Sequence, residues 1–208
     1  MGRNHHAAQS EGIQPGSAPL VRPTRVFVGL KIAPAIASQL AEIVAGLERP
    51  LVRRVAPADI HLTLVAPWNE VSVADAITKL AGVAARCGGF PLRFQHAGYG
   101  PQPRRPRLLW AECVASGEIS ALRTALLQAF GQAVDDRPFL PHVTLARIRA
   151  HPSAIVQRHP IDQPLALTQQ VESIELFQSP PAGESGYRVL ASLQPAEAAQ
   201  SQDGPDST

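Results

Sequence analysis

The sequence predicts an α+β domain built from two related lobes. Strand and helix signals alternate along residues 24–193, and each half of this stretch contains a strand, a helix and a second strand with the same four-residue pattern. The repeated strands begin at His61 and His142, 81 positions apart. This degenerate duplication predicts two lobes that face each other across a cleft, and ligand sites favour such interfaces.

The first half begins with a strand and a helix. Residues 25–32 (RVFVGLKI) are β-branched and apolar, which is typical of a buried strand. Pro34 then opens a helix whose apolar residues recur at helical spacing from Ile36 to Leu47. The elements expected next are a short strand over 52–55, a strand over 60–66 stopped by Pro67, a helix from Ser72 to about Arg86 and a strand over 92–99.

The second half follows a turn-rich loop over 100–106 (GPQPRRP). A strand over 108–114 leads into a helix over 116–133, whose apolar residues from Ile119 to Phe130 fall on one face. The repeated strand over 142–148 comes next, and only a short connecting segment is expected after it. Two last strands are expected over 171–178 and 187–193.

Composition predicts one domain between two solvated tails. Residues 1–23 and 194–208 are rich in small and polar residues without periodic apolar positions, so 24–193 is the expected folded domain. No apolar run is long enough to span a membrane, and the N-terminal residues lack a signal pattern. The two cysteines, Cys87 and Cys113, form no CxxC motif and are expected to be buried thiols. We therefore expect a cytoplasmic protein in a reducing compartment.

The basic residues are almost all arginine. Seventeen of the 19 basic side chains are arginines, and a GC-rich genome alone can produce such a composition. Residues 24–193 carry 17 basic and 13 acidic side chains, a surplus of four. Guanidinium groups bind phosphate in a bidentate manner, and a surplus this small suits a small anionic ligand better than duplex DNA.

The repeated pattern is His-x-Thr-x with apolar residues at both x positions. Residues i and i+2 of a strand share a face, so His61 lies beside Thr63 and His142 beside Thr144. Two such pairs among seven histidines arise by chance with a probability of roughly 2%. The alternatives are half-buried strand residues bonded to backbone carbonyls, or a metal site. A metal site needs a third ligand, which the sequence does not place at a comparable position.

The paired motifs resemble the two-histidine (2H) phosphoesterases. Within that superfamily, the chain is similar to the bacterial and archaeal RNA 2′,3′-cyclic phosphodiesterases, once called 2′-5′ RNA ligases. The first motif departs from the family pattern, since VAPW follows HLTL where a Phe-Leu-Gly run is usual. The matching blocks cover about residues 24–193 and read, in order, RVFVGLKIAP, PRLLWAECV, PFLPHVTLAR and SIELFQSPPAGESGYRVLASL.

The resemblance implies a fold and a reaction. Each lobe would be an antiparallel sheet with outer helices, and the cleft between the lobes would hydrolyse 2′,3′-cyclic phosphate ends of RNA or nucleotides to 2′-phosphates. It implies His61 as proton donor, His142 as proton acceptor and Arg147 as a contact to phosphate or RNA. By strict alternation, Arg147 points to the opposite strand face unless the end of the strand twists. A monomer that associates with no membrane is expected.

Two histidines suit this reaction on physical grounds. In an in-line displacement, water reaches phosphorus from the side opposite the departing ribose oxygen, so one base and one acid must flank it. Histidine titrates near neutrality and serves as either. The hydroxyls of Thr63 and Thr144 can donate to the non-bridging oxygens, where negative charge gathers in the transition state. No metal or organic cofactor is expected.

Three alternatives stay open at this point. The same site would catalyse 2′-5′ RNA ligation, or act on another cyclic nucleotide or a 2′-5′ oligonucleotide. A protein of another class, a non-catalytic RNA-binding module, would not need two imidazoles. Several further side chains are candidates for RNA contacts, namely Arg104, Arg105 and Arg107 in the Pro-rich loop, Trp68, Phe139 and Tyr187.

Overall fold

The computed structural model describes residues 22–196 except 103–104, 135–137, 182–183 and 185. Two serines cap helices as their positions indicate, since Ser72 Oγ accepts from Asp75 N at 3.2 Å and Ser116 Oγ from Ile119 N at 3.5 Å. The elements are, in order, β1 (Thr24–Lys31), α1 (Pro34–Glu42), β2 (Val52–Arg54), a 3₁₀ turn η1 (Pro57–Asp59), β3 (His61–Glu70), α2 (Val73–Ala84), β4 (Pro91–Gly100), β5 (Leu108–Cys113), α3 (Gly117–Ala129), β6 (His142–Ile148), α4 (Pro152–Arg158), β7 (Asp162–Gln170), β8 (Ile174–Gln178) and β9 (Arg188–Leu193).

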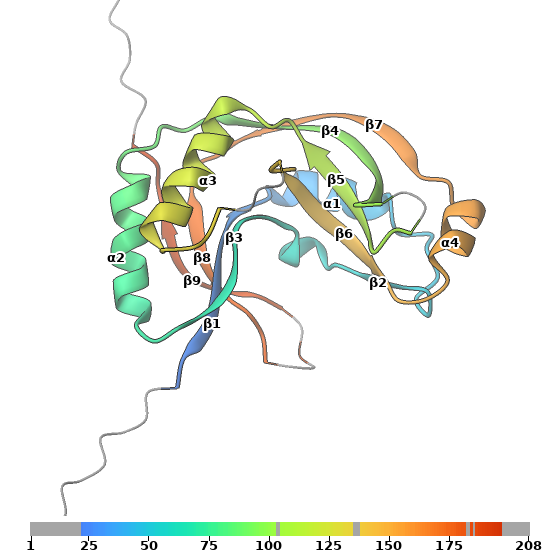
Figure 1. Cartoon of the computed structure of the whole chain (residues 1–208). Helices are drawn as coiled ribbons and strands as arrows, with labels where there is room; N and C mark the ends of the chain where they lie inside the picture. The colour runs from blue at the N-terminus through green and yellow to red at the C-terminus, as the bar shows by residue number, and fades with distance from the viewer. Residues whose placement is uncertain (1–21, 103–104, 135–137, 182–183, 185, 197–208) are drawn as a thin grey trace, which may run out of the picture.

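All the named strands belong to one antiparallel sheet with the order β7-β4-β5-β6-β3-β1-β8-β9, and β2 pairs with β6. The joint between β3 and β6 is a single pair, Leu62 opposite Val143. The sheet therefore divides there into two halves, with β3, β1, β8 and β9 on one side and the other strands on the second. Helices α2 and α3 pack on the first half (Figure 1). This confirms the α+β class, although the lobes share one sheet across a narrow joint.

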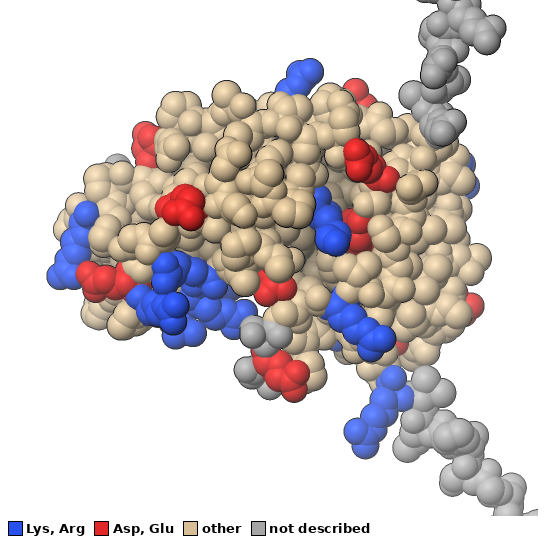
Figure 2. Space-filling view, turned by 180° about the vertical axis from the view of Figure 1, so that it is seen from behind, with Lys and Arg blue, Asp and Glu red and all other residues tan. Residues whose placement is uncertain are grey.

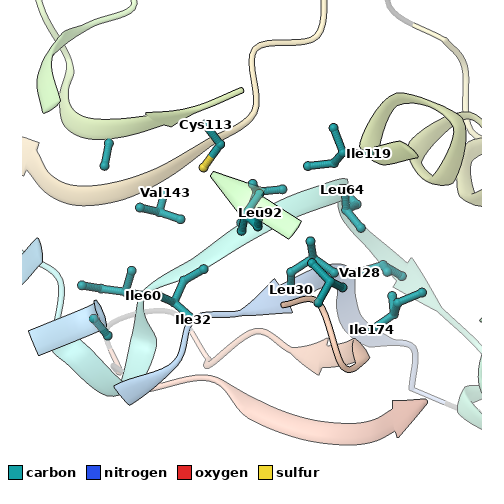
Figure 3. Packing of buried hydrophobic residues seen from close by; sticks show 14 of the residues in the cluster. Val28, Leu30, Ile32, Ile60, Leu64, Leu92, Cys113, Ile119, Val143 and Ile174 are labelled. Carbon is teal, nitrogen blue, oxygen red and sulfur yellow. The ribbon is translucent and has the colours of Figure 1, made fainter. Parts of the chain in front are cut away.

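One hydrophobic core runs through both halves. Its members come from β1, β3 and β8 as well as from β4, β5 and β6, and Figure 3 shows Leu30, Leu64, Leu92 and Val143 among them. Cys113 belongs to this core, where burial raises the pKa of its thiol to about 12, so it is inert as a nucleophile. Cys87 is only half-buried, contrary to the expectation of two buried thiols.

The segment after β6 contains two elements that the sequence reading missed, α4 and β7. Strand β7 lies at the edge of the sheet, and among the described strands it pairs only with β4. Its sequence, DQPLALTQQ, includes Pro164, and its side chains are exposed or half-buried. An edge strand without a buried face produces no apolar signal, and its proline argues against a strand.

Other boundaries shifted by a few residues. Strand β3 continues past Pro67 to Glu70, because the pairing with β1 skips from Val65 to Trp68 and needs no N–H from the proline. Helix α3 ends at Ala129 rather than residue 133. Past β9, Ala196 N donates to Cys87 O at 2.8 Å, so the chain contacts the end of α2 at that point. In the described part of the chain, no helix combines the length and apolarity needed to cross a membrane.

Candidate active site

The two His-x-Thr strands have the same burial pattern. In β3 and in β6, the histidine and the threonine are half-buried while the residue between them, Leu62 or Val143, is fully buried. The next two residues are also buried on both strands, where strict alternation would turn one of them outward. The pairing of each strand with its neighbour is irregular at this point, which is the mark of a β-bulge.

The bulge in β6 determines where Arg147 lies. Leu145 and Ala146 are both buried, so the alternation resumes one residue late and Arg147 returns to the face of His142. Arg147 accordingly lines the same cavity as the two motifs. The equivalent position on β3, after the same bulge, is Ala66. The two lobes thus repeat their backbone but differ in charge at this position.

A cavity of about 50 Å³ brings all five expected site residues together. Its volume is well below the roughly 300–1,000 Å³ of typical ligand pockets. A space of this size suits a phosphate group, with the rest of a nucleotide outside it. The lining residues are His61, Thr63, His142, Thr144 and Arg147, together with Val55, Asp59 and Tyr187.

Each histidine is fixed by a backbone carbonyl two residues before it. The Nδ1 atom of His61 lies 2.7 Å from Asp59 O, and that of His142 lies 2.8 Å from Leu140 O. A carbonyl oxygen only accepts, so Nδ1 carries the hydrogen on both rings. In each neutral ring Nε2 is therefore the unprotonated nitrogen. It is also the atom that exchanges a proton with anything bound in the cavity.

Burial lowers the pKa of both imidazoles below the ordinary 6.5. Desolvation is the largest cause for His61, and the carbonyl and the charge of Asp59 oppose it. Desolvation also dominates the lowered pKa of His142, opposed by its bond to the Leu140 carbonyl and by the charge of Glu112. The Arg147 charge lowers the pKa of both rings. The free site therefore favours neutral histidines at pH 7.

Aromatic side chains hold the two rings. His61 packs against both Phe27 and Tyr187, whose ring centroids are each 4.8 Å from its own, and these two aromatic rings also contact each other with centroids 5.1 Å apart. His142 packs on Trp110 with ring centroids 4.4 Å apart, and Trp110 is buried, with its Nε1 donating to Glu112 at 3.0 Å. These contacts limit the rotation of each imidazole.

Of the further candidates for RNA contacts, Tyr187 lines this cavity, and the other candidates that the structure describes lie outside it. Trp68 packs on Phe130 with ring centroids 4.9 Å apart, and Phe139 lies under the Arg123 guanidinium at 4.5 Å, so both have packing contacts. Arg105 and Arg107 line a separate hollow beside β6. Arg104 falls outside the described residues.

Two residues that line the cavity, Val55 and Asp59, were not predicted from the sequence. Asp59 is the last residue of the 3₁₀ turn η1, which comes before β3, and its Oδ1 accepts from Tyr187 N at 3.1 Å. The position of Asp59 two residues before His61 was visible in the sequence. Asp59 acts on His61 through its backbone carbonyl, however, and every residue has one. Within the described ranges, no group of three or more His, Cys, Asp or Glu side chains is arranged to hold a metal ion.

Fold and site together define a two-lobed protein with paired histidines, and the comparisons place it in a family. Residues 32–179 match the 2′-5′ RNA ligase superfamily, and the chain belongs to that superfamily. It is 31% identical over 137 residues to an RNA 2′,3′-cyclic phosphodiesterase of Bacillus subtilis (strain 168), a match covering 62% of this chain and 73% of the relative.

Solved structures show the same architecture. A protein of Thermus thermophilus superposes with a TM-score of 0.68 at 26% identity, over 82% of this chain and 97% of that one. E. coli LigT complexed with 3′-AMP gives a TM-score of 0.63 at 27% identity, over 83% of this chain and 98% of that one. The expected resemblance and fold class are therefore confirmed.

Proposed function

We propose that this protein hydrolyses 2′,3′-cyclic phosphate ends of RNA to 2′-phosphates by acid–base catalysis with two histidines. The observation that carries the proposal is the pair of imidazoles on one cavity, each with Nδ1 held by a carbonyl and Nε2 free to exchange a proton. The superfamily match and the name of the Bacillus subtilis relative support the substrate class. We propose that it acts as a monomer in the cytoplasm, where its two free cysteines remain reduced.

In the proposed reaction, His142 Nε2 removes a proton from water as the water oxygen bonds to phosphorus. The bond between phosphorus and the ribose 3′ oxygen breaks, and that oxygen receives the Nε2 proton of His61, which enters the step as the doubly protonated imidazolium. The phosphate stays on the 2′ oxygen. This order of roles follows the family resemblance. Proton exchange with solvent then restores both histidines to their starting states.

The remaining cavity residues stabilise charge on the phosphate. Neither Thr63 nor Thr144 uses its hydroxyl in a hydrogen bond to another described residue, so both can donate to non-bridging oxygens. Arg147 supplies a positive charge on the same face. Groups fixed in this way stabilise the charge that develops in the transition state without having to reorganise.

Product analysis tests the reaction and the order of roles together. We expect 2′,3′-cyclic AMP to give 2′-AMP, because proton donation from His61 lets the 3′ oxygen leave. Chromatography against authentic 2′-AMP and 3′-AMP distinguishes the products. Formation of 3′-AMP would contradict the bond cleavage proposed here, and an absence of turnover would contradict the proposed function.

The rate should be highest on the acidic side of pH 6.5. The donor must be protonated and the acceptor neutral, so kcat/KM follows a bell whose limbs report the two free-enzyme pKa values. Both pKa values lie below 6.5, so both limbs lie below it too. On the alkaline limb we expect kcat/KM for 2′,3′-cyclic AMP to fall about tenfold per pH unit. A plateau extending beyond pH 8 would be inconsistent with these pKa directions.

A further inference from the structure

A cluster of arginines adjoins the cavity on one side. We call Arg49, Arg53, Arg54 and Arg149 the arginine track. Strand β2 brings Arg53 directly opposite Arg147 of β6, and like charges in that position destabilise a sheet. Arg53 and Arg149 are exposed, and no described carboxylate lies within 4.0 Å of any guanidinium in the track. An uncompensated cluster of this kind indicates an anionic ligand.

The track is continuous with the catalytic cavity. Four cavity residues (Val55, Asp59, Arg147 and Tyr187) also line an adjoining hollow of about 360 Å³, which Arg53, Arg54 and Arg149 border. These three arginines also line a third hollow of about 450 Å³ together with Arg49. Two carboxylates, Asp59 and Glu184, border the hollow of about 360 Å³, and they are outnumbered by the arginines that line it.

Several basic side chains gather at one end of the molecule, while others are scattered over the same face. Figure 2, seen from behind, shows a group of Lys and Arg side chains at its lower left, the end that carries β2 in Figure 1. The backbone likeness of the two lobes does not extend to this charge. Where β6 has Arg147 after its bulge, β3 has Ala66, followed by Pro67 and Trp68. A ligand that extends from the cavity therefore meets arginines on the β6 side.

The chemistry of the substrate fits a one-sided track. A nucleoside with a 2′,3′-cyclic phosphate is joined to the rest of the RNA through its 5′ oxygen alone, so one strand leaves the cavity. Ligation would require a second strand with a 5′-hydroxyl in the same site. We propose that the arginine track binds internucleotide phosphates of the RNA on the 5′ side of the cyclic end. This inference rests on the proposed function and adds to it a preference for oligonucleotides over mononucleotides.

Kinetics on two substrates test the track. The substrates are 2′,3′-cyclic AMP and an oligoribonucleotide of about eight residues ending in the same cyclic adenylate. For the unaltered protein at low salt, we expect kcat/KM to be at least about tenfold higher for the oligonucleotide, mainly through KM. Each phosphate contact to a single strand adds about 0.7 to the slope of log affinity against log salt. The preference should therefore shrink steeply as salt rises.

The test variant is Arg53→Ala with Arg149→Ala, and the matched control is Arg25→Ala with Arg86→Ala. Both control arginines are exposed and line none of the hollows described above. We expect the ratio of kcat/KM for the oligonucleotide to kcat/KM for 2′,3′-cyclic AMP to fall about tenfold in the test variant. Its slope of log affinity against log salt should become about 1.4 shallower, while the control keeps both values. Its melting temperature should not fall, since Arg53 faces Arg147.

The outcomes separate this inference from the proposed function. If the unaltered protein turns over neither substrate, the proposed function fails. If it turns over 2′,3′-cyclic AMP but shows no preference for the oligonucleotide, or if the test variant keeps the preference and its salt slope, the track does not bind the RNA chain.

Discussion

Replacing His61 or His142 by alanine should lower kcat/KM for 2′,3′-cyclic AMP by about 10²–10⁴-fold in each case, the usual contribution of a positioned proton donor or acceptor. The two losses arise at different steps of one displacement, so neither histidine substitutes for the other. Binding of 2′-AMP should weaken only modestly, because Thr63, Thr144 and Arg147 remain in the cavity. Steady-state kinetics and calorimetric titration with 2′-AMP measure the two effects.

The matched control is His96→Ala. His96 is a strand histidine that pairs with Asp162 at the β4–β7 edge, outside the cavity. We expect this variant to keep its activity. If the His61 and His142 variants retained turnover near that of the His96 variant, the acid–base role would be excluded. Lost product binding with intact turnover in either variant would also contradict it.

Gly29→Ala should damage the fold and the site together. A Cβ on Gly29 would lie 2.5 Å from the carbonyl oxygen of Leu62, a backbone atom between His61 and Thr63. Strands β1 and β3 must separate to admit it, and overpacking of this kind costs about 1–3 kcal/mol. For a domain of this size, 1 kcal/mol corresponds to about 2–4 °C in melting temperature. Thermal unfolding should show that loss, accompanied by a fall in kcat.

Gly82→Ala is the opposite case. Gly82 lies in α2 with nothing within 4 Å of the position that a Cβ would occupy, and alanine is about 0.8–1.0 kcal/mol more favourable than glycine in a helix interior. This variant should melt a few degrees higher and keep its activity. If the Gly29→Ala protein were as stable and as active as the Gly82→Ala protein, β1 and β3 would be able to separate at this point without a cost in stability.

The sequence was sufficient to predict the part of the site that depends on local alternation. His61 and Thr63 share a face because a strand has a period of two, and the buried Leu62 and Leu64 fix which face that is. The strands at the centre of the sheet were readable because their buried faces are apolar. Strand β7 was not, because its half-exposed residues are stabilised by pairing with β4, which a local pattern does not contain.

The pairing between strands also determines to which face of β6 Arg147 points, a question that the sequence left open. The bulge at Leu145 is a property of the register between β5 and β6, and it reverses the orientation that strict alternation gives to Arg147. The hydrogen bond from His61 to the Asp59 carbonyl could not be predicted from the sequence either, since it depends on the backbone path into β3 rather than on side-chain identity. The arginine track exists because β2 pairs with β6, which brings Arg53 and Arg147 together from positions 94 apart.

The central claim is that the imidazoles of His61 and His142 flank one phosphorus atom, and an NMR titration tests it most directly. With histidine side chains labelled with ¹⁵N, 2′-AMP is added and the Nε2 resonances are followed over a range of pH. A phosphate between the two rings favours their charged forms, so the pKa of His61 and that of His142 should both rise with one common binding constant, while the Nε2 resonance of His96 should not respond to 2′-AMP. A response from only one of the two rings, or two different binding constants, would contradict the claim.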